Sequence, residues 1–477
     1  MDGRLFIGGE WIVVDRSFPV LDPATGERVG VAADAGTAEA KAAVDAASKA
    51  FPEWSNLVAT ERANALRRIS AELIEDADRI ADVIVAEQGK PRGQAVWEVR
   101  YATEWIDWFA EEARRTDGRI LPTPSPSKRL LVIRQPLGVA LAITPWNFPV
   151  AMIARKLAPA LASGCTVIVK PAEQTPLSAV AFYEAIERAG LPRGVGNLLT
   201  AAIPEAIAPP LLEDERVRKI TFTGSTEVGK ILVRASADHL ARVSLELGGQ
   251  APFVVFEDAD LDAAVQGVLA SKFQVSGQSC LCANRIYVQS RILEDFSARL
   301  KSAVGTLQVG RGTEPGVDVG PLIDGRAYEK VSRHVADAVE HGASIETGGH
   351  RVERDGFEGG YFFEPTVLSR CSDEMLVARE ETFGPVAPLF SFETETEVVE
   401  RANATPYGLA AYFYTKDAGR TIRVAEALEY GIVGVNDPRP ASPTAPFGGF
   451  KQSGVGREGG QEGIDAFLET KLISIAY

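Results

Sequence analysis

Residues 139–170 have the sequence VALAITPWNFPVAMIARKLAPALASGCTVIVK. Two short apolar runs, at 139–143 and 166–169, flank a segment at about 149–163 whose apolar residues have helical spacing. The same alternation continues as far as residue 247. Strands that alternate with helices predict a parallel, doubly wound α/β sheet. The later apolar runs lie at 196–199, 219–222 and 243–247, with helical stretches at about 177–189, 204–212 and 226–237.

Polar motifs stand directly after these predicted strands, where the ligands of a doubly wound sheet bind. They are TPWN at 144–147, KPAE at 170–173, TGS at 223–225, and Glu246 at the end of the fifth strand. Gly224 and Ser225 begin a helix, and the free N–H groups at a helix start either bind a phosphate or are simply capped. The segment lacks the GxGxxG pattern of common dinucleotide sites, so a dinucleotide would have to bind differently.

The charged and amide side chains of these motifs each have two interpretations. Lys170 and Glu173 either contact the ribose and phosphate of a dinucleotide or form an exposed loop pair. In the first case Glu173 would repel the 2′-phosphate of NADP. Asn147 either shapes a turn or donates a hydrogen bond to a developing oxyanion.

The helix that follows TPWN carries two adjacent cations, Arg155 and Lys156. We expect one of them to face a substrate and the other to meet a structural carboxylate such as Glu458. The alternative is that Arg155 is an ordinary surface charge, as most charged residues on helices are.

Cys280, in the sequence GQSC at 277–280, is a candidate nucleophile. A thiolate attacks a carbonyl carbon and holds it as a covalent adduct. Glu246, in ELGG at 246–249, precedes it by 34 residues and is a candidate base for activating water. Glycines flank both residues and permit close backbone approach, whereas an isolated cysteine is more often a small buried apolar residue. Cys282 either forms a redox-switch disulfide with Cys280 or is an inert neighbour.

The remaining segments suggest further lobes. Residues 1–116 contain short strands and two long helical patterns, at about 60–88 and 92–115. A second α/β pattern occupies 249–446. The proline-rich ribbon at 117–137 and the tail at 463–477 have strand-like sequences, and we expect them to pair between subunits.

The composition argues against several classes of function. The net charge of −15 disfavours a nucleic-acid partner, because phosphate binding needs a basic surface. The most apolar region contains charged residues and proline, so no membrane span is predicted, and the first residues lack the apolar core of a signal peptide. Four cysteines indicate a reducing cytoplasm rather than a disulfide framework. The four histidines form no cluster with metal-ligand spacing, so no metal site is predicted.

Seven motifs together resemble those of the aldehyde dehydrogenase superfamily, in the family's order and over essentially the full length. The resemblance implies an aldehyde dehydrogenase-like α/β fold, in which a doubly wound parallel-sheet domain binds NAD(P) and an α/β domain is catalytic. It places these domains at 1–116 with 138–248 and at 249–446, and a small β oligomerisation element for a homodimer or homotetramer at 117–137 with 463–477. The motifs are TPWNFP (144–149), KPAE (170–173), FTGS (222–225), LELGG (245–249), GQSC (277–280), ETFGP (381–385) and PFGGFKQSG (446–454).

The same resemblance implies NAD(P)-dependent oxidation of an aldehyde to the carboxylic acid through a cysteine thioester. It assigns Cys280 as the nucleophile, Glu246 as the general base and Asn147 as the oxyanion donor. NAD is the expected cofactor, with NADP possible. The positions expected to contact the cofactor are Trp146, Lys170, Glu173, Gly224, Ser225, Leu247, Glu381 and Phe383.

Within the superfamily the chain is most similar to the succinate-semialdehyde type, through AMIARK at 151–156, CLCANR at 280–285 and GIDAFLETK at 463–471. In that subgroup an arginine at the position of Arg155 binds the substrate carboxylate. A second arginine is usual six residues before the nucleophile, where this chain has Gln274. One guanidinium instead of two is expected to tolerate neutral aldehydes better. Ser442 and Phe447 are the other residues predicted to contact the substrate.

Three other functions remain open. A broad-specificity aliphatic or aromatic aldehyde dehydrogenase would share the whole mechanism. A thiol hydrolase would use Cys280 and Glu246 on esters, and its independence of a cofactor would distinguish it. A non-catalytic structural protein on the same fold would be expected to have lost one of these two residues.

Overall fold

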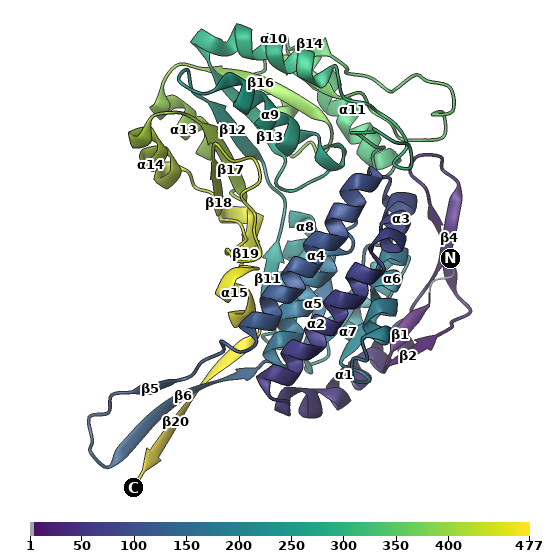
Figure 1. Cartoon of the computed structure of the whole chain (residues 1–477), viewed down its shortest axis with the longest axis vertical. Coiled ribbons are helices and arrows are strands. Elements are labelled where there is room, and N and C mark those ends of the chain that lie inside the picture. Colours follow the sequence, from purple (N-terminus) through teal and green to yellow (C-terminus); the bar gives the residue numbers. More distant parts are fainter. Residues whose placement is uncertain (1–3) are drawn as a thin grey trace.

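The computed structural model describes residues 4–477 and shows two α/β lobes, with a thin ribbon projecting from one of them (Figure 1). The larger lobe contains an eight-stranded sheet of order β19-β11-β10-β7-β8-β9-β1-β2. Five adjacent strands are parallel, as the sequence predicts, and the outer three are antiparallel to their neighbours. The parallel strands are β7 (Val139–Ile143), β8 (Thr166–Lys170), β9 (Gly196–Leu198), β10 (Val217–Thr223) and β11 (Arg242–Glu246). The others are β1 (Leu5–Ile7), β2 (Glu10–Ile12) and β19 (Gly454–Val455).

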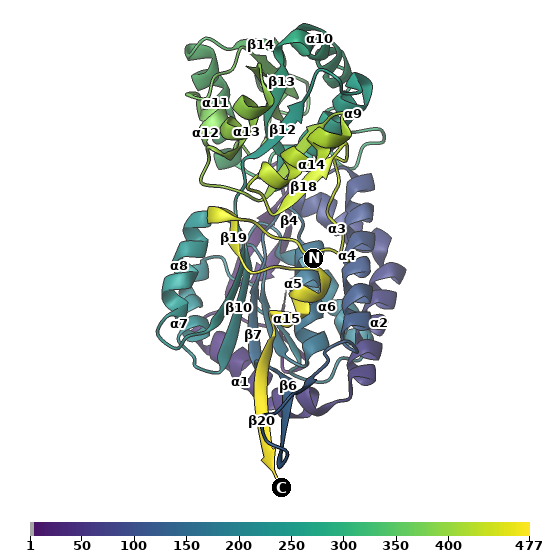
Figure 2. The ribbon, with the colours of Figure 1, turned by 90° about the vertical axis from the view of Figure 1, so that its left-hand side faces the viewer.

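Helices cover both faces of this sheet, as a doubly wound fold requires (Figure 2). Ala140 and Ala142 of β7 pack into the core on one face, whereas Val139 and Leu141 pack into the core on the other. This two-residue alternation is the normal consequence of strand geometry. The first face carries α5 (Ala151–Ser163) and α6 (Pro176–Arg188), with α2 (Ala59–Glu75), α3 (Ala77–Gln88) and α4 (Arg92–Glu112) packed outside them. The second face carries α1 (Thr37–Asn56), α7 (Ala208–Leu212) and α8 (Thr226–Ser236).

The smaller lobe is built on a seven-stranded sheet of order β14-β15-β16-β13-β12-β17-β18. All of its strand pairs are parallel except β14 with β15. Its strands are β12 (Ala251–Val255), β13 (Ala283–Gln289), β14 (Ser344–Thr347), β15 (Thr366–Ser369), β16 (Val386–Phe392), β17 (Ala410–Tyr414) and β18 (Ile432–Val435). Its helices are α9 (Leu261–Lys272), α10 (Leu293–Val304), α11 (Gly325–Glu340), α12 (Leu376–Arg379), α13 (Glu395–Asn403) and α14 (Ala418–Ala427).

The projecting ribbon is a three-stranded antiparallel sheet of order β20-β6-β5. It joins β5 (Arg119–Leu121) and β6 (Lys128–Pro136) to the last strand, β20 (Leu468–Ala476), which follows the short helix α15 (Gly460–Asp465). The two segments with strand-like sequences therefore pair with each other within one chain, and β20 forms the edge of the sheet in both views (Figures 1 and 2). A separate hairpin of β3 (Ser17–Leu21) and β4 (Arg28–Ala33) lies near the start of the chain.

The register of the large sheet brings the predicted polar motifs to one edge. Ile143 at the end of β7 pairs with Lys170 at the end of β8 and with Phe222 of β10. Thr223 at the end of β10 pairs with Glu246 at the end of β11. The carboxyl ends of four parallel strands are thus level, and the loops that follow them open toward the small lobe (Figure 1).

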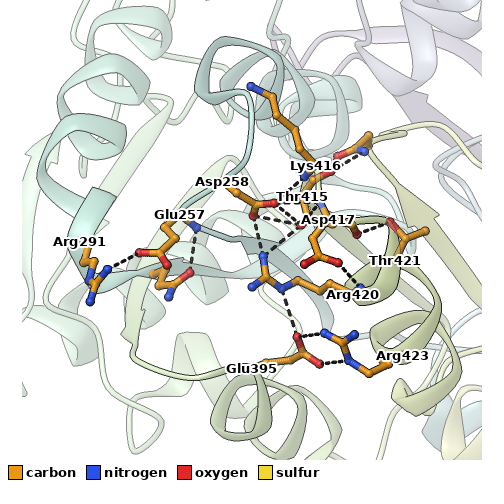
Figure 3. Close-up of polar contacts among 12 residues, drawn as sticks. Glu257, Asp258, Arg291, Glu395, Thr415, Lys416, Asp417, Arg420, Thr421 and Arg423 are labelled. Atoms are coloured by element: carbon orange, nitrogen blue, oxygen red, sulfur yellow. Dashed lines mark hydrogen bonds and ion pairs between the residues drawn. The ribbon is translucent and has the colours of Figure 1, made fainter.

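An ion network ties the strand ends of the small lobe together (Figure 3). Asp258, just beyond β12, accepts hydrogen bonds from the Thr415 hydroxyl, from the backbone N–H groups of Lys416 and Asp417, and from Arg420. Burial acts to raise the pKa of Asp258, but these hydrogen bonds and the charge of Arg420 outweigh it and lower the pKa. The network links β12 to the turn between β17 and α14. Its side chains are partly exposed, and it holds this turn against the end of β12.

One element differs from the sequence expectation. The predicted helix at 60–88 is two helices, because Asp76 has non-helical backbone angles (φ −101°, ψ 12°) and separates α2 from α3. Within residues 4–477, no helix combines the length and the hydropathy needed to cross a bilayer.

Candidate active site

Cys280 lies in a tight loop between α9 and β13. Three successive residues before it, Val275, Ser276 and Gly277, have positive φ angles of 49°, 57° and 74°. Such a backbone is costly for residues with side chains and persists where surrounding contacts hold it. A Cβ atom on Gly277 would lie 2.2 Å from the carbonyl oxygen of Gly384, so only glycine permits this approach. The loop is therefore fixed against the ETFGP segment at 381–385.

Asn147 connects this loop to the large lobe. Its side chain is buried, and Nδ2 donates a hydrogen bond to the backbone oxygen of Gln278 at 2.8 Å. One N–H of the amide is used in this way, and the other remains for a ligand. The structure thus gives Asn147 a loop-fixing contact and places it at the wall of the cavity that contains Cys280.

A buried ion pair holds Asn147 from behind. Lys90 donates to Glu98 and, at 2.6 Å, to the backbone oxygen of Asn147. The other carboxylate oxygen of Glu98 accepts the N–H groups of Val150 (2.9 Å) and Ala151 (3.2 Å) at the start of α5. The pair therefore positions both the candidate oxyanion donor and the helix that carries Arg155. Neither residue is identified by a local motif, so sequence reasoning missed both.

Cys280 lines two cavities at once. One cavity has a volume of about 520 Å³ and the other of about 110 Å³, and residues of both lobes line each of them. Burial raises the pKa of its thiol to about 12, against the lowering effect of the positive charge on Arg155, and Glu381 and Glu246 raise it further. At neutral pH the sulfur is therefore mainly the protonated thiol.

Glu246 lines the larger cavity together with Cys280. Its side chain is buried, and neither carboxylate oxygen has a hydrogen-bond partner. Burial, followed by the nearby charge of Glu458, raises its pKa well above the ordinary range. A Cβ atom on Gly448 would lie 2.9 Å from Oε1, so glycine at that position makes room for the acid. An unpaired carboxyl with a raised pKa beside a thiol is suited to proton transfer.

The larger cavity also collects most of the residues predicted to contact the cofactor. Ser225 is the N-cap of α8, and its hydroxyl accepts the Val228 N–H at 3.3 Å, so the capping interpretation holds alongside any phosphate role. Glu381 accepts the Gly249 N–H at 3.2 Å, and burial raises its pKa to about 7. The predicted residues on this wall are Trp146, Gly224, Ser225, Leu247, Glu381 and Phe383.

Lys170 and Glu173 lie just outside this cavity, whose wall instead includes their neighbour Gln174. The two side chains pair at 3.5 Å, with Lys170 almost fully buried and Glu173 partly exposed. Burial lowers the pKa of Lys170, while the charges of Glu173 and Glu205 raise it. The charge of Lys170 is thus partly compensated by two carboxylates, which suits ribose hydroxyls better than an additional phosphate.

The smaller cavity contains three of the four predicted substrate residues, Arg155, Gln274 and Phe447. Ser442 is not on its wall, because its hydroxyl turns to Thr444 at 2.9 Å. The sequence analysis missed Trp97, Tyr101, Tyr412 and Arg439, which also line it. Of these, Trp97 and Tyr101 stack at 4.8 Å on one face of α4, and their spacing of four residues was the available signal.

The guanidinium of Arg155 lies close to two aromatic rings. Its guanidinium carbon lies 3.9 Å from the centre of Phe447 and 4.5 Å from the centre of Trp105. Nε and Nη2 are buried without a hydrogen bond, although Nη2 lies 2.9 Å from an oxygen of Glu458. Lys156 contacts Glu458 and Arg155 lines the cavity, as expected for this pair of cations. Both meet the same carboxylate, and only Arg155 also faces the cavity.

The second cysteine of the loop does not share the orientation of the first. Cys282 is buried, its sulfur donates to the backbone oxygen of Lys272 at 3.2 Å, and it lines neither cavity. All four cysteines are free thiols. Across residues 4–477 no group of three His, Cys, Asp or Glu side chains is arranged to hold a metal ion.

Known proteins match this chain over its whole length. The model of the aldehyde dehydrogenase family matches residues 11–473. Two relatives from Pseudomonas putida, a glutarate-semialdehyde dehydrogenase and a 3-sulfolactaldehyde dehydrogenase, are 50% and 51% identical, over 99% of this chain and 98% and 96% of their own. An NADP⁺-dependent succinate-semialdehyde dehydrogenase from Escherichia coli is 50% identical over 99% of both chains.

Solved structures agree with the sequence comparison. A crystal structure of an aldehyde dehydrogenase from Brucella melitensis biovar abortus superposes with a TM-score of 0.97 at 50% identity. The match covers 100% of this chain and 97% of the other. The arrangement of two parallel sheets with a projecting ribbon is therefore the aldehyde dehydrogenase fold, as its motifs predict. The chain belongs to the aldehyde dehydrogenase family, whose members use NAD(P).

Proposed function

We propose that this aldehyde dehydrogenase oxidises a short aldehyde with a carboxylate at its far end, such as succinate or glutarate semialdehyde, to the dicarboxylic acid. The observation that carries the proposal is the position of Cys280 between two cavities. The larger one contains Glu246 and most of the predicted cofactor residues, and the smaller one contains the buried guanidinium of Arg155. The names of the similar semialdehyde dehydrogenases agree with it.

The chain's own residues have complementary roles in this proposal. Cys280, once deprotonated, forms a bond from sulfur to the carbonyl carbon, and the oxygen takes up the electron pair. Asn147 Nδ2 and the Cys280 backbone N–H stabilise that oxyanion, and loss of one such donor typically costs about 100- to 1000-fold in rate. Ser225, Glu381 and Phe383 would hold NAD(P), which would supply the hydride acceptor that lets the Cys280 adduct become a thioester. Glu246 then takes a proton from water, which attacks the thioester carbon and releases the acid and the Cys280 thiolate.

The cofactor residues fit a dinucleotide, and we propose that NAD is preferred over NADP. The start of α8 at Ser225 suits a phosphate, and Glu381 and Phe383 line the same cavity. The partly exposed carboxylate of Glu173 supports a role in accepting hydrogen bonds from ribose hydroxyls. Its charge and that of Glu205 disfavour a 2′-phosphate, because Lys170 is already compensated.

We further propose that residues 1–116 and 138–248 act as the cofactor domain and 249–446 as the catalytic domain. Residues 117–137 and 463–477 would then form the assembly element of a homodimer or homotetramer. Exposed apolar side chains on this ribbon, Ile120 and Leu472, support its role in assembly. Four free thiols support a cytoplasmic location.

One experiment tests the reaction and the substrate class together. Absorbance at 340 nm is followed over a panel of aldehydes, with NAD and with NADP, for the native enzyme and for Cys280→Ala, Glu246→Gln and the control Cys371→Ser. We expect ω-carboxylate aldehydes to have the highest kcat/KM, Cys280→Ala to lose turnover, and Glu246→Gln to give a burst of NADH without steady turnover. Steady turnover by Cys280→Ala, or equal kcat/KM for succinate semialdehyde and hexanal, would contradict the proposal.

A further inference from the structure

The substrate-side cavity contains a second guanidinium, supplied by a segment that the motifs do not mark. Arg439 lines this cavity together with Arg155, Gln274 and Cys280. It lies in the stretch between β18 and Phe447, on the small-lobe side, whereas Arg155 is on α5 of the large lobe. The aldehyde would therefore approach Cys280 between two arginines that belong to different lobes.

Arg439 differs from Arg155, whose guanidinium lies beside Glu458, because its own guanidinium forms no ion pair within residues 4–477. No Asp or Glu of residues 4–477 forms an ion pair with its side chain, which is exposed at the cavity mouth. The nearby Asp437 accepts the backbone N–H of Arg439 at 2.9 Å, not its guanidinium. Pro438 and Pro440 flank it and restrict the local backbone, so that the side chain leaves the segment from a fixed point.

The charge of Arg155, in contrast, is already compensated by a carboxylate. Glu458 lies 2.9 Å from its Nη2 and also contacts Lys156. The buried cluster therefore contains two cations and the carboxylate of Glu458. Glu246 is close enough for its charge to favour the protonated form of both cations. A substrate carboxylate that enters the cavity gains orientation from the free Nε of Arg155. The uncompensated charge that would attract it is that of Arg439.

We propose that Arg439 is the second specificity-determining arginine of the substrate site, and that it replaces in space the guanidinium that Gln274 does not supply. Arg155 and Arg439 together bind the terminal oxyanion, a carboxylate or sulfonate, of the aldehyde. This inference rests on the proposed function and adds to it the residue that selects a charged substrate over a neutral one. Arginine suits the role because its planar fork binds such groups through two hydrogen bonds.

The test is the ratio of kcat/KM for a charged aldehyde to kcat/KM for an uncharged one of equal chain length. Succinate semialdehyde is compared with butanal, glutarate semialdehyde with pentanal, and an ω-sulfonate aldehyde with its uncharged analogue. We expect Arg439→Gln to lower the ratio for the carboxylates about tenfold, mainly through KM, and to lower it less at high salt because the side chain is exposed. Arg291→Gln, which removes an exposed charge elsewhere on the same lobe, should leave the ratio unchanged.

A rescue variant separates substrate recognition from a structural effect. Gln274→Arg, introduced into Arg439→Gln, should restore the ratio, because it returns a guanidinium to the same cavity. If Arg439→Gln leaves the ratio of a carboxylate-selective native enzyme unchanged, or if Gln274→Arg gives no recovery, the inference is wrong while the proposed function stands. If the native enzyme shows no preference for charged aldehydes, the proposed substrate class fails and the inference fails with it. The sulfonate pair shows which oxyanion the two arginines prefer.

Discussion

The surroundings of Cys280 favour its thiol over its thiolate. Burial raises the pKa of the thiol to about 12, and among nearby charges only that of Arg155 is found to lower it. In the ligand-free enzyme the thiolate fraction at pH 7 is therefore small and increases as the pH rises toward 12. We expect alkylation of Cys280 by iodoacetamide to accelerate about tenfold per pH unit between pH 7 and 10, because only the thiolate reacts.

Arg155→Gln should slow this alkylation at every pH in that range, because the thiol loses its favourable charge and its pKa rises further. Mass spectrometry of the modified peptide reads the rate for Cys280 separately from the three buried cysteines. A pH-independent rate, or faster alkylation in Arg155→Gln, would show that another group activates the sulfur.

Glu173 gives the second test at the level of single residues. Its carboxylate lies beside Lys170, just after β8, and in our proposal it disfavours the 2′-phosphate of NADP. We expect Glu173→Gln to shift the ratio of kcat/KM for NAD to that for NADP toward NADP by about tenfold, equivalent to ~1.4 kcal/mol. Glu215→Gln, an exposed carboxylate elsewhere in the large lobe, is the control. An unchanged ratio would remove Glu173 from cofactor selection.

At the scale of elements, the start of α5 depends on a helix that is distant in sequence. Glu98 of α4 accepts two N–H groups there and holds Lys90, which in turn holds Asn147. Glu98→Gln leaves the Lys90 ammonium buried and unpaired, and breaking a buried pair in this way costs about 3–5 kcal/mol. We expect a lower free energy of unfolding in urea and partial recovery in the double variant Lys90→Met with Glu98→Gln. Equal stability of native and Glu98→Gln protein would contradict this.

The local sequence predicts the positions of helices and strands better than it predicts which distant residues contact one another. The apolar run at 139–143 coincides with β7, and the run at 166–169 misses only the last residue of β8. These strands are buried on both faces and therefore read as continuous apolar runs. The Lys90 contact with Asn147 spans 57 residues, and no periodicity reports a contact at that distance. Arg439 was not predicted for the same reason, because the cavity that it lines is formed by elements distant in sequence.

Ser442 does not line the smaller cavity, and its contact with the substrate stays a prediction. It lies close to Phe447 in sequence, yet its hydroxyl contacts Thr444 and its side chain lies off the cavity wall. A resemblance between sequences indicates where along the chain a residue stands. The direction of its side chain depends on the conformation of the local turn. The catalytic candidates were more predictable, because strand ends and glycine-flanked loops restrict where their side chains can lie.

At the scale of the whole molecule, the site exists only at the junction of the two lobes. Glu246 ends a strand of the large sheet, and Cys280 precedes a strand of the small one. The segment at 381–385 packs against the Cys280 loop through Gly384 and Gly277. The last part of the chain crosses back, since β19 pairs with β11 in the large sheet. The position of one lobe relative to the other therefore sets the distance between thiol and acid.

The projecting ribbon gives the prediction that concerns assembly. β20 forms its edge, with unpaired backbone groups along one side, and Leu472 and Ile475 on it are 60% and 43% exposed. A long apolar edge strand of this kind is a template for pairing with another chain. We expect the native protein to sediment as a dimer or tetramer, and the double variant Leu472→Glu with Ile475→Glu to sediment as a smaller species with unchanged circular dichroism. Val13→Glu, at another exposed apolar side chain, should leave the mass unchanged. A native monomer in analytical ultracentrifugation, or unchanged assembly in the ribbon variant, would exclude the ribbon as the contact between subunits.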